Sequence, residues 1–482
     1  MSSPLSPCLP DQQPTQSPPP ARWSELLAGR NVVRNLVLAG GTALHATNVF
    51  IVTTLLPSIV HDIGGLSLYA WNTTLFVVAS VVGSASSAQL LRALQPRLAY
   101  VVSTAVFTFG ALLCALAPSM PIMLLGRLIQ GLGGGWLVAL SYAMIRLLFR
   151  PALWPRAMAI VSAMWGIATL VGPAVGGWFA HVDAWRWGFG AVAPFGFIFA
   201  LLASFILPRQ GDEAIRLTQR LPRNQLALLT AAVLAISLGG LAKGVAGQAA
   251  GLIGGSALLG VLAWRERRKE GRLLPHGAFD LRQPLCLLYL MMGMLVCAVS
   301  PEIYVPYFLQ ELNGMTPLGA GYLTATMSAG WTLGSMVSSG FFERRIWIPI
   351  ASGPLCQIVA LVALAIIVPL LSETGVWLRW PTGAGLFLLG LGVGICWPHL
   401  LSQVLERAPK GEGNIAASSI TTIELMAIAI GSSLAGLIVN AAGIDRTAAA
   451  DGAHLAAIWL FALFALVPLL AVLAAVRLLR QR

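Results

Sequence analysis

The sequence predicts an all-α integral membrane protein in which two six-helix bundles flank two inserted helices, giving fourteen transmembrane helices. Of the 482 residues, 57% are hydrophobic and only 10% are charged, and the mean hydropathy is +0.80. A soluble chain carries roughly 25% charged residues, so this composition excludes a water-soluble enzyme. A bilayer core of about 30 Å needs about 20 apolar residues per helix, and with short loops the chain has room for about twelve to fourteen such helices.

Residues 1–31 precede the apolar stretches and are expected to form a disordered cytoplasmic tail, because their first part is rich in Pro, Ser and Gln. Fourteen apolar stretches follow, and the seventh and eighth are short and rich in glycine. Their expected spans are residues 33–57, 70–91, 98–117, 121–147, 157–180, 187–207, 225–242, 247–264, 283–309, 318–341, 347–371, 382–404, 414–440 and 454–477. We therefore expect an N-terminal six-helix bundle over residues 32–207, a linker with two extra transmembrane helices over 208–282, and a C-terminal six-helix bundle over 283–482.

Charge placement supports an even number of crossings. The net charge is +12, and nearly all Lys and Arg residues fall in alternate loops, beginning with the N-terminal tail. The opposite loops hold only Arg186, Lys243, Arg379 and Arg446, and Arg127 alone lies deep inside a predicted span, away from its ends. Because an excess of Lys and Arg marks the cytoplasmic side, both termini are expected in the cytoplasm. The basic charge is then a topology signal, and no nucleic-acid partner is expected.

The two predicted bundles share a weak internal sequence repeat. Pro57 precedes a Gly-Ser pair at residues 83–84, and Pro306 precedes one at residues 334–335, at nearly the same spacing. Basic residues follow each pair. Together with the alternating charges, this similarity suggests two parallel repeats, an arrangement that builds transporters whose site lies at the midplane between the halves.

Several stretches carry patterns that go beyond hydropathy. Residues 126–135 read GRLIQGLGGG in the fourth span, and residues 166–177 read GIATLVGPAVGG in the fifth. FIVTTLLPSIVHDIGG (50–65) ends the first span, and IYVPYFLQELNGMTPLG (303–319) ends the ninth. These stretches resemble the major facilitator superfamily, and in particular its branch of fourteen-helix drug:proton antiporters. The resemblance implies the major facilitator fold, and the GPxxGG pattern in the fifth span implies an exporter.

The sequence departs from that branch at two places. The branch usually carries an Asp in the middle of the first span, where this sequence has Asn48. It also carries an acidic residue in the loop after the second span, where this sequence reads QLLRALQPRL with Arg92 near the acidic position. Proton coupling therefore either diverges in this chain or uses carboxylates elsewhere.

Proton exchange across a membrane needs a buried group that takes up a proton from one side and releases it to the other. Burial favours the neutral form of a carboxyl group, which suits it to this exchange, and ionisable groups inside spans are costly enough to indicate function. Two acids, Glu302 in the ninth span and Glu424 in the thirteenth, lie well inside the predicted spans. Each is expected to carry the coupling proton or to meet a cationic substrate. The alternatives are a water-exposed acid near the outer mouth for Glu302 and a protonated, hydrogen-bonded side chain for Glu424.

Arg127 is the one cation that lies deep inside a predicted span, and an arginine there stays charged and needs polar partners. The resemblance implies a role for it in proton transfer or gating, together with Gln130 and Gly131 of the same motif. The alternative is a fixed polar anchor that organises the first, fourth and fifth spans.

Small residues along the fifth span predict close contact between helices. They are Gly166, Gly172, Gly176 and Gly177, with Pro173 between them. We expect a tight seam that biases alternating access toward export, and generic glycine packing is the alternative.

Four polar or aromatic side chains inside the spans are candidates to line a cavity, the tryptophans for flat apolar solutes and the histidine also as a proton relay. They are His45, Asn48, Trp136 and Trp331. The alternative for each is a packing role, which is common for His and Trp in membrane bundles.

The sequence therefore predicts a secondary transporter and not an enzyme, with no cofactor and no metal site. It is expected to act as a monomer in the bacterial cytoplasmic (inner) membrane, with the small-molecule substrate, protons and the lipid bilayer as its partners. The expected activity is export of an amphipathic drug or secreted metabolite in exchange for protons. An importer or facilitator on the same fold is the nearest alternative, and a membrane-embedded enzyme and a non-transporting sensor are more remote. No GxxxxGK[ST] motif is present in the sequence, so direct drive by ATP is not expected.

Overall fold

The computed structural model describes residues 23–26, 28–150, 153–209, 223–242, 244–268, 274–338, 347–370, 377, 379–409, 412–444 and 449–480. Residues 1–22 of the expected tail, and residues 210–222 of the expected linker, lie outside these ranges. All regular secondary structure within the described ranges is helical.

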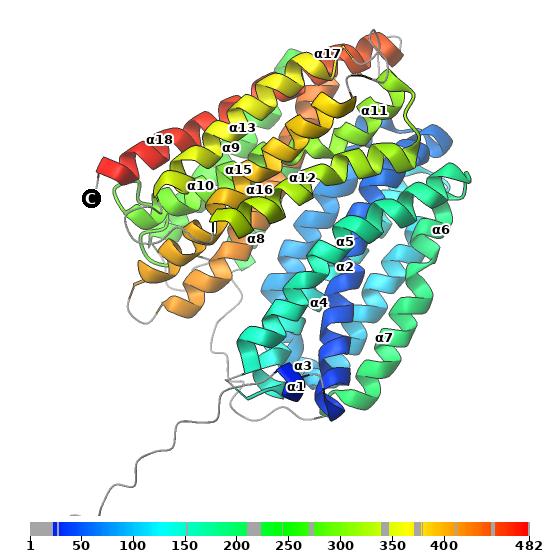
Figure 1. The fold of residues 1–482 in the computed structure, drawn as a ribbon, viewed down its shortest axis with the longest axis vertical. Coiled ribbons are helices and arrows are strands. Elements are labelled where there is room, and N and C mark those ends of the chain that lie inside the picture. The colour runs from blue at the N-terminus through cyan, green and yellow to red at the C-terminus, as the bar shows by residue number, and fades with distance from the viewer. Residues whose placement is uncertain are drawn as a thin grey trace, which may run out of the picture.

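The helices form two bundles. The first consists of α1 (Trp23–Leu26), α2 (Gly29–Ile63), the 3-10 helix η1 (Leu66–Leu68), α3 (Trp71–Ala115), α4 (Met120–Leu148), α5 (Trp154–His181), α6 (Trp185–Gly190) and α7 (Val192–Ile206). Two further helices, α8 (Arg223–Leu241) and α9 (Val245–Arg268), follow. The second bundle consists of α10 (Pro284–Ala298), η3 (Ser300–Tyr304), α11 (Val305–Asn313), α12 (Pro317–Ser338), α13 (Trp347–Ile367), α15 (Arg379–Glu406), α16 (Gly413–Ala441), α17 (Ala449–Phe464) and α18 (Leu466–Arg480). Figure 1 shows the two bundles inclined to each other, with α5 and α12 side by side where they meet.

The described part contains twelve stretches that are long and apolar enough to cross a membrane. One of them, Leu66–Ala115, has 50 residues and covers two of the predicted spans. The helix α12 is not among the twelve, because Gly, Ser and Thr residues lower its hydropathy. The all-helical membrane fold is therefore confirmed, and the count of fourteen stays a prediction.

The long helix α3 is two limbs joined at a bend. Its 45 residues would span about 68 Å if straight, more than twice the bilayer core. Gln95 has the non-helical angles φ 63° and ψ 164°, since the proline that follows it disfavours the α conformation. A Cβ on Gly131 of α4 would lie 2.2 Å from the carbonyl oxygen of Phe76, and one on Gly133 would lie 2.4 Å from the nitrogen of Phe107. Both limbs of α3 therefore lie beside the same stretch of α4.

The span predicted at residues 283–309 is not one continuous helix. It divides into α10, η3 and α11. Pro306 lacks an N–H, and its ring clashes with the carbonyl four residues earlier, which belongs to Glu302. That carbonyl instead accepts a hydrogen bond from the N–H of Val305, in the tighter 3-10 pattern. The break places Glu302 on a short turn between two helices.

The span predicted at residues 454–477 is interrupted for the same reason. α17 ends at Phe464, four residues before Pro468. Both breaks correct the continuous helices that hydropathy predicted, because hydropathy does not register a missing backbone donor.

The inserted helices lie at the edge of α16. The hydroxyl of Ser237 on α8 donates to that of Ser433 on α16 at 2.9 Å. Leu229 and Val233, also on α8, belong to the hydrophobic core of the first bundle. A Cβ on Gly251 of α9 would lie only 2.4 Å from a backbone Cα atom of α8. The helix α8 therefore connects the two bundles, and α9 packs against α8.

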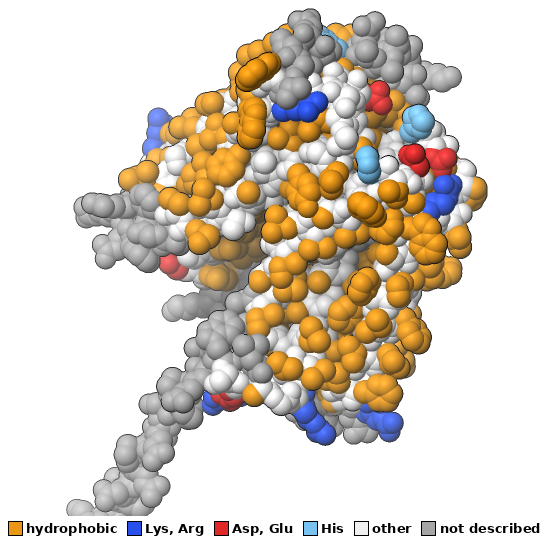
Figure 2. All heavy atoms as spheres, turned by 45° about the vertical axis from the view of Figure 1, so that its right-hand side comes forward, with side chains coloured by type: hydrophobic (Ala, Val, Ile, Leu, Met, Phe, Trp, Pro, Cys, Tyr) orange, Lys and Arg blue, Asp and Glu red, His pale blue; other side chains and the backbone are white. Residues whose placement is uncertain are grey.

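The outer surface of the bundles is apolar. Phe197 and Phe205 on α7 are 69% and 76% exposed. On the face shown in Figure 2, hydrophobic side chains cover the middle of the molecule, and charged side chains lie toward its ends. This distribution matches a protein whose middle contacts lipid.

Helix pairs at corresponding places in the two bundles pack backbone to backbone. In the α3–α4 pair, a Cβ on Gly83 would lie 2.3 Å from the carbonyl oxygen of Leu132. In the α12–α15 pair, a Cβ on Gly390 would lie 1.8 Å from the carbonyl oxygen of Met327. Lipid tails are as apolar as leucine, so close packing of this kind is a main source of helix association in a bilayer.

We expect Gly390→Ala to lower the thermal stability of the purified protein, because the added methyl group must push α12 and α15 apart at a cost of about 1–3 kcal/mol. The matched control is Gly254→Ala on α9, where a Cβ would have no neighbour within 4 Å. The control is expected to melt at or slightly above the parent temperature, since alanine favours helix. Equal melting temperatures for the two variants would contradict the close packing of α12 on α15.

Candidate functional site

Contacts between the two bundles gather at the helix ends opposite the chain termini. The rings of Tyr69 and Tyr304 stack with their centroids 4.7 Å apart. The hydroxyls of Thr74 on α3 and Ser432 on α16 lie 2.9 Å apart. This end of the molecule is therefore closed by direct contact between the bundles.

The glycine and proline motif of α5 lies at this closed end. A Cβ on Gly172 would lie 2.3 Å from the Cβ of Phe50, and one on Gly176 would lie 2.8 Å from the carbonyl oxygen of Ile51, both on α2. Gly177 faces the other bundle, and a Cβ on it would lie 2.5 Å from the Cα atom of Leu318 on α12.

Two further members of the α5 motif differ in their surroundings. Pro173 is buried, and a Cβ placed on Gly321 of α12 would lie 3.2 Å from the Cβ of Pro173. Gly166 is exposed, and a Cβ there would have no neighbour within 4 Å. Only the second part of the predicted motif therefore forms the contact between bundles.

Glu302 lies in a void between the bundles. The void has a volume of about 10 Å³, which is the space of a single water molecule. It is lined by Phe50, Thr53, Thr54 and Pro173 from the first bundle and by Glu302, Pro306, Gly321, Thr324 and Ala325 from the second. Glu302, which is half-buried, therefore lies between residues of both bundles.

Three threonine hydroxyls determine what the void offers to that carboxyl group. Thr53 donates to the carbonyl of Val49 at 3.0 Å, and Thr54 donates to that of Phe50 at 3.1 Å. Thr324 donates to the carbonyl of Ala320 at 2.8 Å. Each hydroxyl proton is used within its own helix, so the hydroxyl oxygens remain as acceptors. A void lined by acceptors suits a carboxyl group that carries a proton and can donate it.

Glu424 lies on α16 and is half-buried. It does not line the void around Glu302. A Cβ on Gly431 of α16 would lie 2.0 Å from the hydroxyl of Ser300 on η3. Glu424 lies seven residues before that glycine, about 10 Å along the helix. The structure therefore places the two predicted carboxyl groups in the same bundle at different levels.

Arg127 on α4 is buried, with 2% of its surface exposed. Its Nη1 donates to Oδ1 of Asn48 at 2.7 Å and to Oε1 of Gln130 at 2.6 Å. Its Nε donates to the backbone carbonyl of Asn72 at 3.3 Å, and its guanidinium lies 3.9 Å from the ring centroid of Phe76. In the part of the chain that the structure describes, the two ion pairs are Arg150–Glu25 and Arg186–Asp62, so Arg127 has neutral partners there.

The partners of Arg127 come from α2, α3 and α4. The alternative role for Arg127 was a polar anchor that organises the first, fourth and fifth spans. In the structure, the second span contributes partners in place of the fifth. Gly131, next to Gln130 in the same motif, packs on the backbone of α3. The side-chain nitrogens of Asn48 and Gln130 have no hydrogen-bond partner among the described residues.

His45 lies one turn before Asn48 on α2, in an aromatic cage. Its ring stacks on Phe76 with centroids 5.1 Å apart and meets Trp165 edge-on at 5.9 Å. It is 5% exposed. His45 therefore packs on the ring that also covers the guanidinium of Arg127.

The two predicted cavity tryptophans have packing partners. The indole nitrogen of Trp136 donates to the hydroxyl of Ser86 at 2.8 Å. Trp331 meets Trp397 edge-on, with centroids 5.6 Å apart. Both are half-buried, and neither lines the void around Glu302.

Sequence reasoning missed the threonines of the void and the aromatic side chains Phe76, Tyr69 and Tyr304. The threonines carry a weak signal, because two adjacent hydroxyl residues precede Pro57 in an otherwise apolar stretch. The aromatic residues carry none, since a ring in an apolar span is compatible with lipid, core and site alike.

Comparison with known proteins agrees with this architecture. The sequence profile of the Major Facilitator Superfamily matches residues 38–432. A "Probable multidrug-efflux transporter" of Mycobacterium tuberculosis is 39% identical over 442 residues, which cover 90% of this chain and 93% of that protein. The "Multidrug transporter protein MdtP" of Bacillus subtilis is 25% identical over 422 residues, which cover 86% and 76%.

A solved structure shows the same fold. It is a bacterial homologue of the human lysosomal transporter Spinster, in an inward-facing and unoccupied conformation. The TM-score is 0.64 at 14% sequence identity, and the match covers 94% of this chain and 98% of that one.

We expect Asn48→Ala to destabilise the protein by about 1.5–3 kcal/mol, because it removes a hydrogen bond to a buried charge. The matched control is Asn35→Ala on the same helix, where the asparagine is 3% exposed and its side-chain oxygen is unpaired among the described residues. Thermal unfolding of both variants in the same detergent measures the difference. A control that melts as low as Asn48→Ala would contradict a special role for the contact with Arg127.

Proposed function

The chain belongs to the Major Facilitator Superfamily and is a multi-pass membrane transporter and not an enzyme, and on this premise we propose that it exports small amphipathic molecules in exchange for protons by alternating access. The names of the two multidrug relatives support export of amphipathic compounds. The observation that carries the exchange for protons is the position of Glu302 between residues of the two bundles.

The closed end of the molecule supports the order of events. With both termini in the cytoplasm, as the distribution of Lys and Arg favours, the closed end faces outward. When the bundles part there, Glu302 is exposed to the outside and takes up a proton. The neutral carboxyl group fits the acceptor-lined void, so the bundles close around it. A charged carboxylate in the same void would lose its hydration without gaining a donor, which disfavours closure.

Proton release and substrate loading belong to the other side. Glu424, about 10 Å along α16 from the level of η3, is the second carboxyl group of the same bundle. We assign it to the stage in which the molecule is open toward the cytoplasm, where it meets the substrate or receives the departing proton. Arg127 stays charged throughout, because its amide and carbonyl partners do not titrate. We therefore assign it to holding α2, α3 and α4 together.

A transporter that does not exchange protons is the second candidate. The observation that favours it is Asn48, which stands where the antiporter branch usually has an acid and which binds Arg127 without a charge of its own. Right-side-out and inverted vesicles separate the two functions. A proton-coupled exporter accumulates a fluorescent dye such as ethidium in inverted vesicles with an acidic interior, whereas a facilitator only equilibrates the dye.

We expect Glu302→Gln to reduce dye accumulation driven by the pH gradient by about tenfold or more, because the coupling proton loses its carrier. The matched control is Glu311→Gln on α11, a nearby exposed glutamate, and it is expected to keep parental transport. Glu424→Gln is measured beside them and is expected to lower transport as well.

Dye exchange without a gradient tells coupling from folding. Glu302→Gln is expected to retain this exchange, since glutamine mimics the neutral carboxyl group. Gradient-driven transport at the parental rate in Glu302→Gln would remove this residue from the mechanism.

We expect Gly177→Ala to hinder closure between α5 and α12, because the added methyl group meets the backbone of Leu318. A cost of about 1 kcal/mol corresponds to a shift of about fivefold toward molecules open at this end. Spin labels on the two bundles at that end measure the populations by their distance distribution. Gly166→Ala, in the open part of the same motif, is the control and is expected to leave the distribution unchanged.

A further inference from the structure

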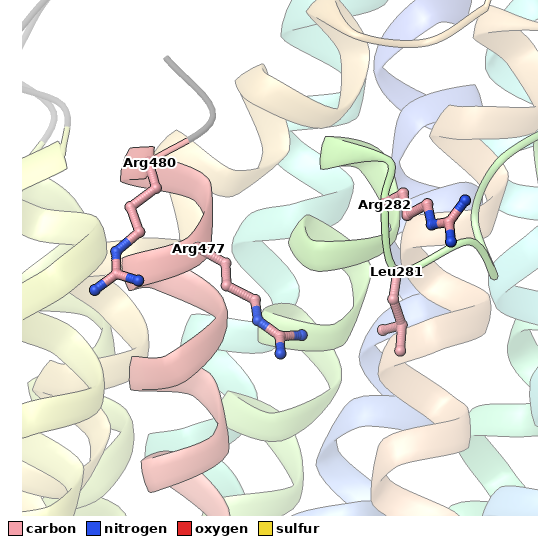
Figure 3. Close-up of a pocket in the computed structure, with 4 residues that line it drawn as sticks. All are labelled: Leu281, Arg282, Arg477 and Arg480. Atoms are coloured by element: carbon pink, nitrogen blue, oxygen red, sulfur yellow. The ribbon is translucent and has the colours of Figure 1, made fainter.

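A pocket at the end of the second bundle that carries the C-terminus is lined by arginines. It has a volume of about 440 Å³ and is lined by Leu281, Arg282, Arg477 and Arg480. Arg477 and Arg480 belong to the last turn of α18, and the other two belong to the loop that precedes α10. Figure 3 shows Arg477 pointing from α18 toward the loop, with Arg480 on the other side of the helix end.

The pocket contains three cations and no acid among its lining residues. The nearest acid along the loop is Asp280, whose Oδ1 accepts a hydrogen bond from the backbone N–H of Arg282 at 3.1 Å. Arginine guanidinium groups bind phosphate oxygens in a planar, two-pronged geometry. The lining therefore suits a phosphate group.

An apolar stripe leads from the pocket toward the middle of the membrane. Leu466, Leu470 and Leu473 are 56%, 51% and 60% exposed, and at 100° per residue they share one face of α18 with Arg477 and Arg480. The opposite face of the helix, which includes Ala471 and Ala474, is buried.

The length of the stripe matches a lipid tail. From Leu466 to Arg477 the helix rises about 16 Å, which is close to half of the bilayer core. A phospholipid site needs a cationic part for the phosphate group and an apolar part for the acyl chain. The arginines and the exposed leucines of α18 supply these two parts. A soluble phosphate compound would use the arginines and leave the stripe unused.

We infer that this pocket binds the headgroup of an anionic phospholipid whose acyl chain lies along the exposed leucines of α18. Clusters of arginine near the membrane surface attract anionic headgroups. The ligand is distinct from the exported substrate, because the residues that line this pocket include none of those that line the void between the bundles.

Native mass spectrometry of the full-length protein in neutral detergent tests the inference. Phosphatidylglycerol and phosphatidylcholine with identical acyl chains are titrated separately. The parent is expected to retain phosphatidylglycerol at least about fivefold more tightly than phosphatidylcholine. The double variant Arg477→Gln and Arg480→Gln is expected to lose this preference, and the double variant with lysine at both positions is expected to keep part of it.

The control is the double variant Arg30→Gln and Arg92→Gln, which removes two exposed arginines from the first bundle and is expected to keep the preference. A melting temperature equal to the parent's shows that each variant is folded. The site would be overturned if the parent retained both lipids equally. It would also be overturned if the control variant lost the preference for phosphatidylglycerol to the same extent as the Arg477→Gln and Arg480→Gln variant. Release of phosphatidylglycerol by millimolar inorganic phosphate would show an anion site that does not require lipid, and would overturn the assignment to phospholipid.

Discussion

Close approach of helix backbones is the constraint on which the rest of this structure depends. Lipid competes for every apolar side chain, so burying leucine gains little, and the helices associate through contacts that lipid cannot make. Within each bundle these contacts are the tightest, as at Gly83 against α4 and Gly390 against α12. Between the bundles, a Cβ on Gly177 would lie 2.5 Å from the Cα atom of Leu318. A Cβ on Gly436 of α16 would lie 2.7 Å from the Cβ of Ala70, which precedes α3. In the alternating access that we propose, the contacts between the bundles are the ones that part.

The same constraint explains how polar groups are distributed. No water satisfies a backbone or side-chain group in the bilayer core, so each must find a partner in the protein. Arg127 finds amide oxygens and a phenylalanine face, all supplied by its own bundle. Its environment therefore persists when the bundles move. Glu302 lies between residues of both bundles, so its environment would change if the bundles moved apart. A titratable group whose neighbours come from both bundles can couple a proton to their movement. A group whose partners all belong to one bundle cannot.

Hydropathy and charge predicted the membrane fold and the positions of nearly all helices, because both depend on composition along the chain. The motif around residues 166–177 was enough to indicate the family, which the profile match confirms. Contacts that depend on the register between helices were out of reach. Nothing in the sequence indicates that Phe76 would cover Arg127, or that Asn72 would offer its carbonyl. The bend at Glu302 was predictable in principle from Pro306, but hydropathy alone treats that stretch as one helix. The roles assigned to Glu302 and Glu424 stay predictions.

The two bundles differ in the charges they enclose, and this difference bears on the mechanism. The first bundle holds a fixed cation in its core, and the second holds both carboxyl groups, Glu302 and Glu424. A charge on Glu302 in the closed molecule would lie in the void that Thr53 and Thr54 also line, and their hydroxyl oxygens present acceptors to it. Protonation removes that penalty and turns the same two hydroxyls into partners. The difference in free energy between protonated and ionised Glu302 therefore arises at the surface where the bundles meet. In the mechanism that we propose, one carboxyl group at this surface links proton uptake to closure, without an ion pair between the bundles and without an acid at the position of Asn48.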